Sequence, residues 1–207
     1  MIDEAGPSAP TFLFGHGAGA TMDAPFLATV AKGLAQRGVR VARFEFAYMA
    51  VRRSGGSKRP PPKVDLLQDE FREFVQALPR AGPLIIGGKS MGGRVASLVA
   101  DELLAAGDIC GLLCLGYPFH PQGKPEKLRT AHLAGLQTPT LICQGTRDPF
   151  GTDAEVAGYA LSEQIEIAWV DDGDHDLKPR KRATGLSHEE QLEQVCDAAA
   201  AWIKARG

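Results

Sequence analysis

The sequence lacks long apolar runs, paired cysteines and a large net charge, and each absence excludes a class of protein. No apolar run approaches the ~18 residues that a membrane-spanning helix needs, so we expect no membrane insertion. The four cysteines form no CxxC pair and lie within apolar runs, which is typical of reduced, intracellular cysteines. A formal net charge of −2 gives no overall attraction to nucleic acid or to an anionic membrane surface.

The N-terminal segment also lacks the basic start and apolar stretch of a signal peptide, because residues 1–7 are acidic and contain Gly and Pro. We therefore expect a cytoplasmic protein, with residues 1–10 as a flexible segment. The 207 residues fit a single domain, 1–207, which can bury roughly 70% of its unfolded surface without disulfides or metal ions.

The chain does contain a regular alternation of short apolar runs and segments of helical periodicity. The apolar runs that predict strands are 11–14, 39–46, 83–87, 111–116, 140–144 and 165–170. The helical stripes begin at Phe26, Leu67, Val95 and Leu192. This alternation predicts an α/β fold, a three-layer αβα sandwich whose mostly parallel sheet has about six strands. Two long polar connections, 49–63 and 118–137, follow predicted strands, so we expect them at the carboxyl edge, where such sheets bind ligands.

A GxSxG motif, residues 88–92, lies between a predicted strand and the helical run 94–106. A serine on this sharp turn exposes its hydroxyl above the sheet, and glycines are needed on both sides because a Cβ would clash with neighbouring backbone. Ser90 is therefore a candidate nucleophile. The N–H of Met91 lies at the start of the helix, where it can face an oxyanion.

A serine hydroxyl needs a base to remove its proton and a group to orient that base. Asp148 follows the run 140–144, and His175 follows the run 165–170. Both should reach the edge that carries Ser90, and Ser, Asp, His is the chain order of an α/β-hydrolase triad. An ordinary turn aspartate before a proline is the alternative interpretation of Asp148, and Asp174 is the rival orienting group.

Four other histidines compete with His175 for the role of base. His16 precedes Gly17 in a glycine-rich turn, and His120 follows the fourth predicted strand, so His120 remains the alternative base. The two in predicted helical segments are His132 and His188. We expect the substrate-binding residues to be His16, Gly17, Lys89 and His120, with the side chain of Lys89 facing solvent or ion-paired.

The glycine-rich loop 15–20 follows the first predicted strand. In a hydrolase this loop supplies the second oxyanion donor, and the N–H of Ala18 is the candidate, typically worth ~3 kcal/mol in the transition state. The alternative is a phosphate-binding loop, but neither GxGxxG nor GxxxxGK[ST] is present. We therefore expect no nucleotide, no other organic cofactor and no metal.

Taken together, segments 15–19 and 88–92 with Asp148 and His175 resemble the α/β-hydrolase superfamily, in the compact, nearly lidless build of dienelactone hydrolases. Residues 11–182 look more specifically like a hydrolase-like domain family shared by a subunit of the NSL chromatin complex and a testis-expressed protein. The strings that carry this likeness are 43–49, 87–94, 116–121, 123–126 and 145–148. The resemblance implies the α/β-hydrolase fold, the same triad and oxyanion residues, and a minimal lid or none.

Two basic runs lie near the predicted active edge. They comprise Arg52, Arg53, Lys58, Arg59 and Lys63, and then Lys178, Arg180, Lys181 and Arg182. One hypothesis is that they attract an anionic substrate, and the alternative is ordinary solvated loop charge. Nucleic-acid binding is not expected, because aromatic residues other than Tyr48 do not interleave with these charges.

The sequence thus predicts a serine hydrolase that cleaves a carboxylic ester or thioester of a small soluble substrate through an acyl-enzyme intermediate. The alternative is a catalytically silent scaffold of hydrolase shape that binds a protein partner, as some members of the resembled family do.

Overall fold

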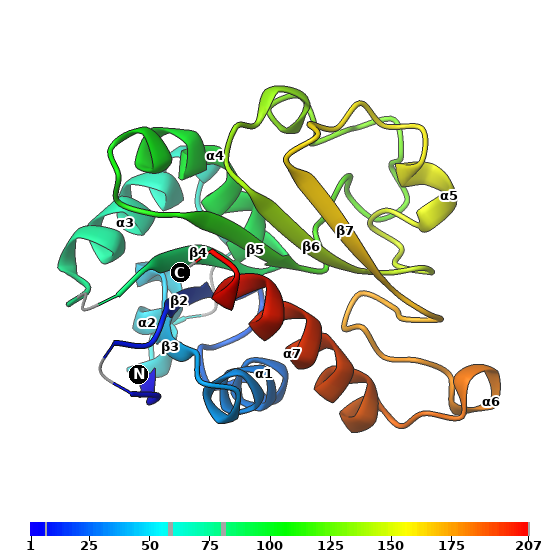
Figure 1. Ribbon diagram of the computed structural model, residues 1–207. Helices are drawn as coiled ribbons and strands as arrows, with labels where there is room; N and C mark the ends of the chain where they lie inside the picture. The colour runs from blue at the N-terminus through cyan, green and yellow to red at the C-terminus, as the bar shows by residue number, and fades with distance from the viewer. Residues whose placement is uncertain (7, 58–59, 80–81, 207) are drawn as a thin grey trace.

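The computed structural model describes residues 1–6, 8–57, 60–79 and 82–206, and in this part of the chain a single sheet carries helices on both faces (Figure 1). Its strands are β1 (Ile2–Asp3), β2 (Thr11–Gly15), β3 (Arg40–Phe44), β4 (Leu84–Lys89), β5 (Gly111–Leu115), β6 (Thr140–Gly145) and β7 (Ile165–Val170). The helices are α1 (Pro25–Gln36), α2 (Ala47–Arg53), α3 (Val64–Ala77), α4 (Met91–Ala105), α5 (Asp153–Val156), α6 (Lys181–Thr184) and α7 (His188–Lys204), with the 3-10 helix η1 (Leu133–Gly135).

The strands lie in the order β1-β3-β2-β4-β5-β6-β7, and all pairs are parallel except β1 with β3. The expected αβα sandwich with a mostly parallel sheet is confirmed. The strand that the sequence did not predict is β1, which lies inside the segment expected to be flexible. It is held by pairing of its backbone with β3, for example Ile2 with Ala42, and by the 2.9 Å ion pair of Asp3 with Arg43. These contacts join residues about 40 apart, so the local sequence does not signal the strand.

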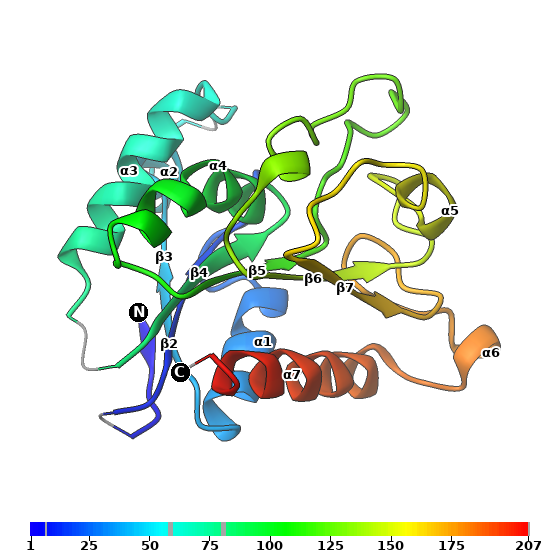
Figure 2. The same ribbon diagram turned by 45° about the horizontal axis from the view of Figure 1, so that its top comes forward.

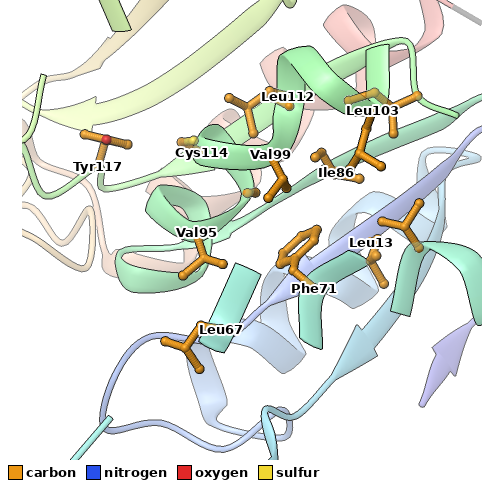
Figure 3. Packing of buried hydrophobic residues seen from close by; sticks show 14 of the residues in the cluster. Leu13, Leu67, Phe71, Ile86, Val95, Val99, Leu103, Leu112, Cys114 and Tyr117 are labelled. Carbon is orange, nitrogen blue, oxygen red and sulfur yellow. The ribbon is translucent and has the colours of Figure 1, made fainter. Parts of the chain in front are cut away.

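Alternating side chains of each strand fill two separate cores. Phe12 and Phe14 of β2 pack with α1 and α7 on one face, whereas Leu13 between them packs with α3 and α4 on the other. Figure 2 shows α1 and α7 on one side of the sheet, with α2, α3 and α4 on the opposite side. Figure 3 shows the second core, where Phe71 of α3 lies near Leu13 and Val99. Burial on both faces explains the continuous apolar runs of the central strands.

Part of the first long connection is helical, because α2 occupies residues that we expected to form a polar loop. The carboxylate of Glu70 on α3 accepts a hydrogen bond of 2.7 Å from the N–H of Ala47, the first residue of α2. Such a cap depends on a tertiary contact, so the local sequence does not signal it. Lys58 and Arg59 of the same connection lie outside the described residues. No helix in the described ranges is long and apolar enough to cross a membrane.

Helix α4 approaches β2 backbone to backbone at Gly92. A Cβ on this residue would lie 2.6 Å from the carbonyl carbon of Gly15 and 2.8 Å from the carbonyl oxygen of His16. Because both contacts are rigid main chain, Gly92→Ala is expected to destabilise the fold by about 1–3 kcal/mol or more. Urea unfolding measures this loss. Gly135→Ala is the matched control, since its Cβ would meet no atom within 4 Å, and equal midpoints for the two variants would contradict the prediction.

Candidate active site

Three side chains that the sequence places after separate strands meet at the carboxyl edge of the sheet. Ser90 follows β4, Asp148 follows β6 and His175 follows β7. Nδ1 of His175 lies 2.8 Å from Oδ2 of Asp148, and Nε2 of the same ring lies 2.8 Å from Oγ of Ser90. The predicted triad residues therefore form a continuous line of hydrogen bonds.

Ser90 adopts a strained backbone conformation at the turn between β4 and α4. Its φ of 51° and ψ of −113° are rare for a residue with a side chain, and its N–H donates to the carbonyl of Leu115 over 3.1 Å. A Cβ on Gly88 would lie 2.5 Å from the carbonyl oxygen of Gly15, and Gly92 is equally crowded. The flanking glycines therefore permit the turn, as the motif predicted.

Asp148 is fully buried and held at both oxygens. Oδ2 accepts from Nε2 of Gln144 at 3.0 Å as well as from His175, and Oδ1 accepts from the N–H of Phe150 at 2.9 Å. An ionised carboxylate can only accept, so the shared proton is on Nδ1 of His175. Its Nε2 is then left to accept the proton of the Ser90 hydroxyl. The ring of Phe150 packs on the imidazole with centroids 4.2 Å apart.

Gln144 contacts the candidate triad at Asp148, and the sequence reasoning missed it. It is fully buried, and besides Asp148 its Nε2 donates to the carbonyls of Tyr117 and Gly151, while its Oε1 accepts from the N–H of Tyr117. Its amide thereby fixes the carboxylate and ties the loops after β5 and β6 together. The available signal was a polar residue at the end of an otherwise apolar strand.

Lys89 contacts the backbone of the loop that carries His175. Its Nζ donates to the carbonyl oxygen of His175 at 2.6 Å and lies 3.4 Å from Oδ1 of Asp176. The residue is only 5% exposed, and burial lowers the pKa of its ammonium group. This burial corrects the expectation of a solvent-facing lysine, and the alternative expectation, an ion-paired side chain, is observed.

Asp172 stabilises the same loop through contacts with Arg180, a residue on the far side of His175 in the sequence. Its carboxylate accepts from the N–H and the guanidinium of Arg180, and these hydrogen bonds lower its pKa to about 2. The basic run that follows His175 is therefore partly committed to ion pairing within the chain. In the first basic run, Arg53 likewise pairs with Glu45 at 2.7 Å and Asp23 at 2.9 Å. These arginines are thus engaged by the protein's own carboxylates.

The glycine-rich loop after β2 is shaped by the fully buried His16. The N–H of Phe46 donates to Nε2 at 3.2 Å, which leaves the proton on Nδ1 for the carbonyl of Gly17 at 2.7 Å. Burial also lowers the pKa of His16. Both ring nitrogens are thus occupied by backbone groups of the chain, one of them on this loop. Gly17 does lie beside Ser90, because a Cβ there would be 3.7 Å from that of the serine.

The remaining candidate histidines lie apart from Ser90. His120 is 2% exposed, with Nδ1 at 2.9 Å from the carbonyl of Pro121 and Nε2 at 3.6 Å from Glu155, so its expected contact with substrate is not supported by its position. His132 lies in a turn before η1, not in the predicted helix, and its Nε2 is 2.9 Å from Oγ of Ser97. Ser97 is itself 2% exposed within α4, which gives this second pair no access to a substrate.

A cavity of about 350 Å³ opens beside Ser90. Ala18 and Met91, the two predicted oxyanion residues, line it, and the hydroxyl of Tyr48 holds the loop by donating to the carbonyl of Ala18 at 2.9 Å. Its apolar walls are formed by Pro61, Pro62, Val64, Leu67, Pro118 and Phe150, and Arg94 and Arg129 complete the lining. Within the described ranges, no group of three or more His, Cys, Asp or Glu side chains could hold a metal ion.

Known proteins share this architecture. The esterase domain of a Rhodothermus marinus protein is 16% identical, with 99% of this chain and 91% of that chain covered at a TM-score of 0.68. Dienelactone hydrolase from Anabaena variabilis is 18% identical, with 98% of this chain and 88% of that chain covered at a TM-score of 0.69. The thioesterase domain from the curacin biosynthetic pathway is 14% identical, with 98% of this chain and 93% of that chain covered at a TM-score of 0.60. At these identities the likeness shows the fold. The family described as alpha/beta hydrolase domain matches residues 8–204, so this chain belongs to that family.

Proposed function

We propose that the protein is a serine hydrolase that cleaves a carboxylic ester or thioester through an acyl-enzyme intermediate. The observation that carries this proposal is the hydrogen-bonded line from Ser90 Oγ through His175 to the buried Asp148. The esterase and thioesterase structures of the same fold support the class of substrate. We also propose that the protein belongs to the narrower family shared by the NSL subunit and the testis-expressed protein. A cytoplasmic location is proposed as well, and the four free cysteines are consistent with it.

The chemistry follows from the positions of the protons. As Ser90 Oγ attacks the carbonyl carbon, Nε2 of His175 takes the hydroxyl proton, and the ionised Asp148 stabilises the imidazolium. The C–O or C–S bond of the substrate then breaks as the imidazolium gives its proton to the leaving oxygen or sulfur, so that an alcohol or thiol departs and the acyl group stays on Ser90. Water repeats the sequence, with His175 again as base, and releases the carboxylic acid and the free serine.

The negative charge that develops on the carbonyl oxygen needs donors close to Ser90. We assign them to the N–H groups of Met91, the first residue of α4, and Ala18, on the loop after β2. Both residues line the cavity that contains the serine. Each such donor is typically worth about 3 kcal/mol in the transition state.

A fluorophosphonate probe tests the proposal, because it forms a covalent bond only with an activated serine. We expect one label per protein molecule, located by mass spectrometry after trypsin digestion. Ser90 and the buried Ser97 fall on different tryptic peptides, since Arg94 lies between them. Folded wild-type protein that takes up no probe would instead support the catalytically silent scaffold.

Lys89→Met is expected to lower kcat by about 10- to 100-fold with little change in KM, because the variant loosens the loop that positions the His175 ring. Lys89→Arg should recover part of the loss. Steady-state kinetics across pH measures both values. Lys178→Met, on the exposed part of the same loop, is the control and should match wild type. Equal rates for the two Met variants would show that Lys89 has no positioning role.

A further inference from the structure

Two arginines line the cavity beside Ser90, and the proposed triad does not use them. Arg94 lies one helical turn after Ser90 on α4, and Arg129 comes from the connection that follows β5. Neither belongs to the two basic runs that the sequence singled out. No aspartate or glutamate is among the described residues that line this cavity.

Neither guanidinium has an acceptor in the described part of the chain. Nε of Arg94 is buried from solvent and lacks a hydrogen-bond partner, and no ion pair reaches Arg94 or Arg129 from any described carboxylate. By contrast, Arg43, Arg53 and Arg180 are each hydrogen-bonded to a carboxylate of the chain. Because a buried donor without a partner is costly, Nε of Arg94 has an unfilled requirement for an acceptor, and the half-buried Arg129 lines the same cavity.

The electrostatics of the pair point in the same direction. Burial and the neighbouring charge of Arg94 both lower the pKa of Arg129. Tyr117 and His132, beside the pair, add no negative charge, because burial raises the pKa of the tyrosine hydroxyl and a histidine is either neutral or positive. Asp101, the carboxylate that acts on His132, accepts hydrogen bonds from the N–H groups of Gln137 and Thr138. An anion placed between the two guanidinium groups would remove their mutual repulsion and satisfy their donors.

The other residues that line the cavity indicate which kind of spacer would connect this anion to the reacting carbonyl of the substrate. Its walls are prolines, Val64, Leu67 and Phe150, which suit a short apolar spacer. One helical turn separates Ser90 from Arg94 along α4, a rise of about 6 Å. A spacer of a few methylene groups spans such a distance.

We propose that Arg94 and Arg129 form a subsite for a carboxylate, so that the substrate is a half-ester or half-thioester of a short dicarboxylic acid. This inference rests on the proposed function, because it names the substrate class of the same site. Recognition of an anionic substrate is thereby assigned to Arg94 and Arg129 inside the cavity, and not to the two exposed basic runs.

The test compares the p-nitrophenyl half-ester of glutaric acid with p-nitrophenyl pentanoate, a neutral ester with the same number of acyl carbons. We expect wild type to favour the half-ester in kcat/KM, and Arg94→Met or Arg129→Met to lower that preference by about 10- to 100-fold. Arg94→Lys should retain part of it. Arg182→Met, which removes the same charge from the exposed α6, should leave the preference unchanged.

Binding of glutarate, measured by calorimetry, gives a readout that does not depend on catalysis. We expect wild type to bind it and both Met variants to bind it more weakly. Hydrolysis of both esters without preference, and without glutarate binding, would overturn the subsite and leave the proposed function intact. If wild type hydrolyses neither ester, but binds glutarate and loses this binding in the Met variants, the subsite is supported. The proposed hydrolase function is then overturned.

Discussion

Ser90→Ala is expected to lower kcat for ester hydrolysis by about 10⁴-fold or more. The variant lacks the oxygen that attacks the carbonyl and that lies 2.8 Å from Nε2 of His175. Cavity, oxyanion donors and base all remain, so substrate binding should change far less than turnover. Initial rates under saturating substrate, together with Kd for an inhibitor, separate these two quantities.

Ser97→Ala is the matched control for this experiment. Ser97 also lies next to a histidine, with its Oγ 2.9 Å from His132, but it donates to the carbonyl of Arg94 and is buried within α4. We expect the variant to retain most of its activity, with a modest loss of stability from the missing hydrogen bond. Loss of activity in Ser97→Ala, with activity kept in Ser90→Ala, would transfer the nucleophile to the second pair.

His175→Ala is expected to cost a comparable factor, about 10⁴- to 10⁶-fold in kcat. Its imidazole is the group within hydrogen-bond reach of the Ser90 hydroxyl, and without it that hydroxyl keeps its proton near neutral pH. Asp148→Asn should cost about 10⁴-fold, because the amide cannot hold the proton on Nδ1 in the same way. Kinetics near neutral pH measure both losses.

His120→Gln is the control, since His120 is the alternative base. The structure places it against Pro121 and Glu155, so its loss should alter stability more than kcat. A His175→Ala variant with near-full activity, beside an inactive His120→Gln, would reverse the assignment.

The fold was predictable where the pattern is local and repeated. Central strands buried on both faces are continuous apolar runs, and the runs at 111–116 and 140–144 coincide within one residue with β5 and β6. The misses have tertiary causes. Strand β1 depends on pairing with β3, and α2 begins at a cap supplied by Glu70 from another helix.

The site was predictable where chemistry follows the ends of strands. Ser90, Asp148 and His175 follow β4, β6 and β7, and the parallel topology brings them together. Gln144 and Lys89 could not be assigned in the same way. Their roles are contacts with residues distant in sequence, and a polar side chain at a strand end carries no mark of its partner.

The consecutive residues Lys89 and Ser90 both hydrogen-bond to His175, the lysine to its backbone carbonyl and the serine to its imidazole ring. Two consecutive residues of one chain segment therefore set the distance between attacking oxygen and base. When thermal motion shifts β4, both attachment points move with it, and the loop of His175 is carried along. We therefore expect the distance between the reacting groups to change little when the sheet flexes, and heating to impair turnover mainly when the fold itself begins to unfold.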